Sequence, residues 1–183
     1  MMKDSELKTN LFMIGNAREG HLDVIQQLER GEWEEESFQH FRDLYNINPE
    51  GILVAVDNNG DVLGYVAWIL QNAENIEMYP YDFDPREAHK PKGDEPYIAA
   101  HGVRKDVRGK GIGSKLIEEL KERLSKTGFK KIAFTYNINL GTKWYWDKLG
   151  FDPVDGTYDK NWSPIKGKEP TMGAILYECN LIG

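Results

Sequence analysis

The chain alternates between segments with apolar residues at helical spacing and short runs of apolar and β-branched residues. Apolar positions three or four residues apart predict amphipathic helices, whereas short apolar runs bounded by turn residues predict strands. The helical spacing predicts four helices, over residues 20–30, 34–45, 112–127 and 140–149. The apolar runs predict strands over residues 11–14, 52–56, 62–70, 97–103, 131–136, 150–154 and 173–181.

The order of these segments predicts an α+β fold. We expect a central mixed, largely antiparallel, twisted sheet of six to seven strands, flanked by about four helices, in a single domain over residues 1–183. The turn residues 57–61 join two strands as a hairpin. The proline-rich segment 72–96 is interpreted either as a substrate-facing flap or as a surface insertion, and 155–170 as a loop.

A glycine-rich turn follows the predicted strand 97–103 and opens the predicted helix at Ile112. Such a turn can aim several main-chain N–H groups at one point, where the helix N-terminus adds partial positive charge. This arrangement favours a diphosphate ligand, and Arg108 and Lys110 supply further positive charge. The alternative interpretation is a helix start that uses glycine only for tight packing.

Two common nucleotide-binding patterns do not match this turn. The Walker pattern has four residues between its glycines and ends in Gly-Lys-Ser/Thr, and that ending is absent here. The dinucleotide fingerprint, G-x-G-x-x-G, is followed about twenty residues later by an acidic residue. Here the spacing is G-x-G-x-G, and the strand 131–136 carries no acid. A nucleotide-binding regulator is therefore only a third hypothesis for the chain.

The turn and a later stretch resemble two motifs of one enzyme family. Arg108, Gly111 and Gly113 match Gln/Arg-x-x-Gly-x-Gly/Ala, the acyl-CoA-binding signature of the GCN5-related N-acetyltransferase (GNAT) family. Downstream, Asn139 and residues 148–151 are similar to the family's second stretch, Asn-x-x-Ala-x-x-x-Tyr-x-x-x-Gly-Phe. The resemblance covers residues 97–151 closely, and the predicted order of helices and strands matches the family's fold.

The resemblance implies an enzyme that transfers an acetyl group from acetyl-CoA to a primary amine by direct attack. Backbone N–H groups near Val103 would hold the pantetheine arm and polarise the thioester carbonyl, while residues 108–114 would hold the pyrophosphate. The implied cofactor contacts are Val103, Arg108, Gly109, Lys110, Gly111, Ile112, Gly113, Ser114, Asn139 and Trp146. The acceptor would be a small amine or a protein N-terminus, and a homodimer is compatible with the family.

The catalytic residues depart from the family pattern at one position. Trp146 stands where family members carry the tyrosine proposed to protonate the departing thiolate, and an indole N–H is not a usable acid near neutral pH. Tyr145, rotated by about 100° on a helix, is our candidate acid, while Trp146 would pack against the pantetheine arm or in the core. His101 is the first candidate for the base that deprotonates the amine; the alternative is a core histidine bonded to backbone. Weaker candidates for the base are Glu74, Glu77 and His89.

Composition narrows the functional classes further. With 40% apolar and 29% charged residues, the 183-residue chain has the composition of a soluble globular protein. Its net charge of −7 argues against nucleic-acid binding. No apolar run is long enough for a membrane span, and the polar N-terminus lacks a secretory pattern, so we expect a cytoplasmic protein. No metal-ligand spacing occurs, and Cys179 is interpreted as an inert buried thiol.

A second functional class also fits the same residues. The fold could serve as a non-catalytic regulatory module that binds acyl-CoA or an amine without turnover, since fold alone does not determine function. The tryptophan at position 146 favours this alternative, because it removes the family's proposed acid. Release of free thiol from acetyl-CoA in the presence of amines distinguishes an enzyme from a module.

Overall fold

The computed structural model describes residues 12–29, 40–70, 96–162 and 172–181. Most of the segment 72–96, which carries Glu74, Glu77 and His89, lies outside the described residues. The same holds for the first part of the helix predicted over 34–45 and for all of 163–171.

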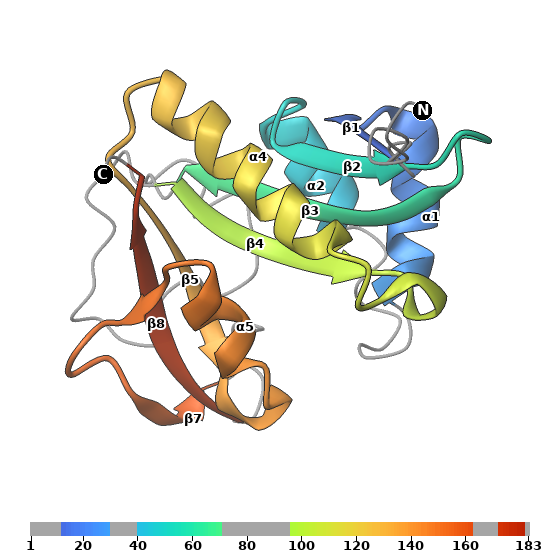
Figure 1. Ribbon diagram of the computed structural model, residues 1–183. Coiled ribbons are helices and arrows are strands. Elements are labelled where there is room, and N and C mark those ends of the chain that lie inside the picture. The colour runs from blue at the N-terminus through green and yellow to red at the C-terminus, as the bar shows by residue number, and fades with distance from the viewer. Residues whose placement is uncertain (1–11, 30–39, 71–95, 163–171, 182–183) are drawn as a thin grey trace, which may run out of the picture.

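Eight strands of the described chain form one mixed sheet in the order β1-β2-β3-β4-β5-β8-β6, with β7 also paired to β8 (Figure 1). The strands are β1 Met13–Asn16, β2 Ile52–Val56, β3 Val62–Leu70, β4 Pro96–Val103, β5 Lys131–Asn137, β6 Asp152–Pro153, β7 Asp159–Trp162 and β8 Met172–Asn180. Because only β4 and β5 pair in parallel, the predicted mixed, largely antiparallel sheet is confirmed. The loop predicted over 155–170 is wrong in part, since β7 gains its structure from pairing with β8, which its polar sequence does not reveal.

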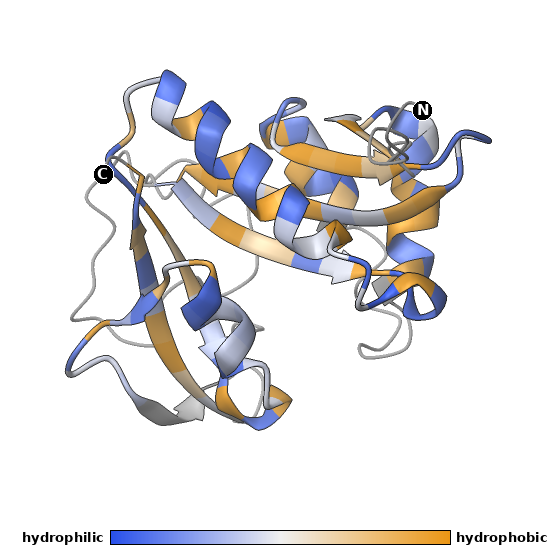
Figure 2. Cartoon of the chain, viewed as in Figure 1, coloured by the Kyte–Doolittle hydropathy of each residue, from blue (hydrophilic) through white to orange (hydrophobic). Residues whose placement is uncertain are grey.

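Four α-helices of the described residues cover the two faces of the sheet. They are α1 Glu19–Glu29, α2 His40–Ile47, α4 Ile112–Lys126 and α5 Lys143–Lys148. Successive side chains of a strand point to opposite faces, so Leu53 and Ala55 pack in the core beneath α4, whereas Ile52 and Val54 pack beneath α1 and α2. Apolar residues are concentrated along these strands, while α4 turns polar residues outward (Figure 2).

Helix α4 follows the sequence prediction closely. Its apolar stripe is buried, and the buried residues are Ile112, Leu116, Ile117, Leu120 and Leu124. The helix ends where predicted, because Gly128 takes a φ of 93°, a left-handed conformation that costs glycine little. The hairpin turn is likewise confirmed, with Gly60 at φ 86° and its N–H donating to the Asp57 carbonyl at 3.0 Å.

The helix predicted over 140–149 is shorter than expected. A 3-10 turn, η3 (Ile138–Leu140), comes first, and Gly141 at φ 64° separates it from α5. The predicted capping role of Asn139 is wrong, since Thr142 is the N-cap residue of α5. Instead the Asn137 side chain accepts the Asn139 N–H at 2.9 Å and caps η3. Local side-chain bonding to the backbone thus competes with helix formation here.

The parallel strands β4 and β5 separate after a single paired position, Tyr97 opposite Ala133 (Figure 1). Beyond it β5 pairs along its length with β8, and β4 pairs with β3. A β-bulge at Ala99, opposite the Ala67/Trp68 step of β3, bends β4 at this point. As a result, residues 99–103 are half-buried although their strand lies inside the sheet.

Two buried tyrosines on neighbouring strands provide a test of this packing. The Tyr97 hydroxyl accepts the Thr135 N–H at 3.0 Å, whereas the Tyr65 hydroxyl, fully buried beside Gly102, has no hydrogen-bond partner within the described chain. A lost buried hydrogen bond costs about 1–2 kcal/mol. We therefore expect Tyr97→Phe to lower the free energy of unfolding by that amount, and Tyr65→Phe to leave it unchanged or raise it. Urea denaturation measures both, and an equal loss in the two variants would contradict the structure.

Candidate active site

The glycine-rich turn joins the end of β4 to the first turn of α4. Gly109 and Gly111 take φ values of 77° and 82°, and a Cβ at either position would meet no atom within 4 Å. Gly111 is the N-cap residue of α4 and has no side chain that could cap the helix. The Gly111 carbonyl accepts the N–H of Lys115. Within the described residues, the N–H groups of Ile112 and Gly113 have no acceptor. The turn is therefore open and has the properties of an anion site.

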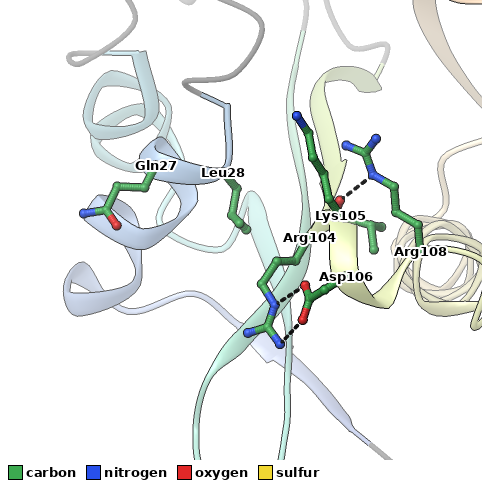
Figure 3. Close-up of a pocket in the computed structure, with 7 residues that line it drawn as sticks. Gln27, Leu28, Arg104, Lys105, Asp106 and Arg108 are labelled. Atoms are coloured by element: carbon green, nitrogen blue, oxygen red, sulfur yellow. Dashed lines mark hydrogen bonds and ion pairs between the residues drawn. The ribbon is translucent and has the colours of Figure 1, made fainter.

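Cationic side chains surround this turn. The Arg108 Nε donates to the Val103 carbonyl at 2.9 Å, which ties the turn to the end of β4. Arg104 forms two hydrogen bonds with Asp106, at 2.7 and 3.0 Å, and these bonds hold the pKa of the Asp106 carboxyl below its usual range. With Lys105, these residues line a pocket of about 380 Å³ (Figure 3). Since Arg104 offsets the one carboxylate, the pocket carries net positive charge in an acidic chain.

His101 lies on β4 with both ring nitrogens occupied. Its Nδ1 is 2.9 Å from the Tyr65 carbonyl oxygen, and its Nε2 is 2.9 Å from the Tyr145 hydroxyl. A carbonyl can only accept, so Nδ1 carries the proton and Nε2 accepts the Tyr145 O–H. Burial disfavours the imidazolium and lowers the pKa of His101 to about 4. The ring is therefore neutral at physiological pH.

Tyr145 reaches from α5 to the start of α4. Burial raises the pKa of its hydroxyl well above the usual range, a hydrogen bond with Ser114 opposes this shift, and the Glu118 charge adds to it. Its ring stacks on His101 with an interplanar angle of 9°. The Cβ of any larger residue at Gly113 would lie 2.9 Å from the Tyr145 oxygen. The structure thus brings together four predicted site residues, from β4, α4 and α5.

Trp146 meets this group only through ring contacts, and Asn139 lies apart from it. Trp146 is 8% exposed and packs against Phe134, with ring centroids 4.0 Å apart, and against Phe151. It belongs to the core beneath α4, although its edge also meets the His101 ring. Asn139 is exposed in η3, and no described contact joins its side chain to the turn. Consecutive helical residues point in different directions, so Tyr145 faces α4 where Trp146 faces the core.

Several contributors were not identified from the sequence. The Tyr65 carbonyl is a long-range backbone contact, and the Arg104–Asp106 pair joins two side chains two residues apart; no sequence pattern indicates either contact. Gln27 and Leu28 of α1 line the pocket from the opposite side. In the described ranges, no group of three or more His, Cys, Asp or Glu residues could hold a metal ion. None of the described helices has the length and apolar character needed to cross a bilayer.

Comparisons with known proteins place this arrangement in a family. The profile of the Acetyltransferase (GNAT) family matches residues 21–151. Ard1 from Thermoplasma volcanium has a similar structure, with a TM-score of 0.69, 14% identity and coverage of 94% of this chain and 99% of that one. The Escherichia coli ribosomal-protein-S18-alanine N-acetyltransferase has a TM-score of 0.62 and 17% identity, with coverage of 93% of this chain and 94% of that one. Arabidopsis thaliana Naa50, solved with the bisubstrate analogue CoA-Ac-MVNAL, has a TM-score of 0.61 and 18% identity, with coverage of 92% of this chain and 97% of that one. No curated protein matches the chain significantly in sequence.

Gly113 offers a test of the geometry around Tyr145, with Gly20 as a matched control. Both are the second residue of a helix, but a Cβ at Gly20 meets no atom within 4 Å, whereas at Gly113 it meets the Tyr145 hydroxyl and the His101 ring. Alanine is favoured over glycine in helices by up to about 1 kcal/mol. Gly20→Ala should therefore raise the free energy of unfolding, and Gly113→Ala should lower it by about 1–2 kcal/mol. Thermal or urea denaturation measures both variants. An equal rise in the free energy of unfolding in Gly20→Ala and Gly113→Ala would refute the close approach of Tyr145 to Gly113.

Proposed function

Because this chain belongs to the GNAT family of acetyltransferases, we propose that it transfers an acetyl group from acetyl-CoA to a primary amine. The observation that carries the proposal is the open turn 109–113, with uncapped N–H groups at the start of α4 and cationic neighbours. This turn follows β4, whose residues 99–103 are half-buried because β5 pairs with β4 only at Tyr97. An anion site next to an open strand edge fits a ligand with a diphosphate and a long polar arm.

The described residues fit coenzyme A from its diphosphate to its thioester. The N–H groups of residues 109–114 would bind the pyrophosphate, with Arg108 and Lys110 offsetting its charge. The pantetheine arm would lie along β4, where the side chains of Ala99, Ala100 and Gly102 are small. Main-chain N–H groups on that strand would polarise the thioester carbonyl, which contributes a few kcal/mol of transition-state stabilisation. Trp146 would act through core packing, since it is buried.

The transfer needs two proton movements. The amine attacks in its neutral form, the C–N bond forms as the C–S bond breaks, the nitrogen loses one proton and the thiolate gains one. We assign Tyr145 as the proton donor to the thiolate, because its hydroxyl lies beside the first turn of α4 and a phenol carries its proton at neutral pH. Tyr145 would thereby replace the family tyrosine missing at position 146.

Acceptors of two classes fit this chemistry, a small amine and the N-terminal amine of a protein. The Naa50 structure holds an analogue that joins CoA to a peptide. The Escherichia coli neighbour is named as an N-acetyltransferase for an alanine of ribosomal protein S18. These neighbours support the protein N-terminus as the acceptor to test first.

The buried Trp146 also supports a second candidate, a module that binds acyl-CoA without turnover. The two functions separate in an assay of thiol release from acetyl-CoA with a panel of peptide N-termini and small amines. An enzyme releases thiol in an amine-dependent manner, whereas a module binds coenzyme A with no release above the buffer rate.

Arg108 provides the most direct test of the cofactor site. Removing a charged contact to a phosphate costs roughly 1.5–3 kcal/mol, so Arg108→Ala should weaken coenzyme A binding at least tenfold. Arg42→Ala is the matched control, since Arg42 is exposed on α2 and pairs with Asp23 rather than with a residue of the turn. Isothermal titration calorimetry measures both affinities. An unchanged coenzyme A affinity in Arg108→Ala would show that the pyrophosphate does not bind at this turn.

A further inference from the structure

Three polar groups form a continuous hydrogen-bonded chain across the site. It runs from the Tyr65 carbonyl on β3, through His101 on β4, to Tyr145 on α5. The chain therefore links three secondary structure elements that the rest of the fold holds in place. His101 is its centre, because both of its ring nitrogens are used.

We propose that His101 is a positioning residue, which holds the Tyr145 hydroxyl beside the first turn of α4 rather than accepting the proton of the acceptor amine. This inference rests on the proposed transferase function, in which Tyr145 is the proton donor. It assigns His101 a role different from the base expected for it from the sequence.

The hydrogen bonds determine the tautomer of His101. The Tyr65 oxygen can only accept, so the proton lies on Nδ1 and the lone pair on Nε2. The Tyr145 O–H fills that lone pair at 2.9 Å. To act as the base, His101 would first have to lose this bond, and its burial would then oppose the positive charge it gained.

Packing holds the ring pair in this orientation. Tyr145 stacks on His101 with centroids 5.9 Å apart, and Trp146 meets the same imidazole at 5.7 Å in an edge contact. The first turn of α4 lies directly beneath, since a Cβ on Gly113 would come within 3.1 Å of His101 Nε2. A side chain at position 113 would displace the pair, so glycine there serves the hydroxyl as well as the turn.

The proton balance of the transfer closes without an imidazolium. The amine nitrogen releases one proton to solvent water as the C–N bond forms. As the C–S bond breaks, the Tyr145 O–H turns from His101 Nε2 and gives its proton to the thiolate. Tyr145 then regains a proton from water. His101 stays neutral throughout, and its Nε2 holds the Tyr145 hydroxyl in position.

A double-mutant cycle tests whether His101 acts through Tyr145. We compare Tyr145→Phe, His101→Leu and the double variant, with Tyr158→Phe, at an exposed tyrosine, as the matched control. Each single variant should lower kcat by about 100-fold with KM for the amine little changed, and the double variant should be no slower than either. Multiplied losses of about 10⁴-fold would show two independent roles and overturn the inference.

A conservative variant separates this role from a contribution to folding. The glutamine amide has one acceptor oxygen and one donor nitrogen, so His101→Gln can replace both bonds but cannot act as a base near neutral pH. We expect it to recover kcat to within about tenfold of the wild type. A His101→Gln variant that folds, as judged by circular dichroism, and is as slow as His101→Leu would refute the positioning role.

Nitrogen NMR of the imidazole tests the same geometry without turnover. The wild-type protein should show the Nδ1–H tautomer for His101, assigned by the loss of its signals in His101→Gln, and Tyr145→Phe should weaken that preference. An Nε2–H tautomer in the wild type would overturn the inference. Absence of thiol release from the wild type with every amine would instead refute the proposed function, and with it the role of His101 in that reaction.

Discussion

The parting of β4 and β5 is the constraint on which the site depends. The two strands share one paired position, Tyr97 with Ala133, and then follow different partners, β3 and β8. Parallel neighbours inside a sheet normally bury each other's edges. Here the second half of β4 is half-buried and carries small residues, so among the described residues one edge of β4 has no strand partner beyond Tyr97. We infer that the ligand supplies the hydrogen bonds that β5 does not.

The open edge gains its chemistry from segments on one face of the sheet. The glycine turn places uncapped N–H groups and cations at the end of β4, and α5 brings Tyr145 to His101 above the first turn of α4. Positive charge is local, in a chain with a net charge of −7. This separation of charge favours an anionic cosubstrate at the turn while the remaining surface stays acidic.

Local patterns in the sequence predicted the parts of the fold that local forces determine. The stripe of α4, its stop at Gly128 and the hairpin turn at Gly60 follow from spacing and backbone freedom. The side-chain partners of the site were not predictable in the same way. Whether Tyr145 or Trp146 faces α4 depends on the start of α5, which Gly141 shifts toward the C-terminus, and on the aromatic core around Phe134. Strand β7 and the Tyr65–His101 contact likewise arise from long-range pairing.

We infer that main-chain amides of the turn bind the diphosphate of coenzyme A. Titration of the labelled protein with coenzyme A, followed by amide NMR, tests it residue by residue. We expect the amides of residues 109–114 to shift most strongly, together with those of 99–103 on the open edge of β4. Saturable binding that leaves residues 109–114 unperturbed and shifts amides elsewhere would contradict it.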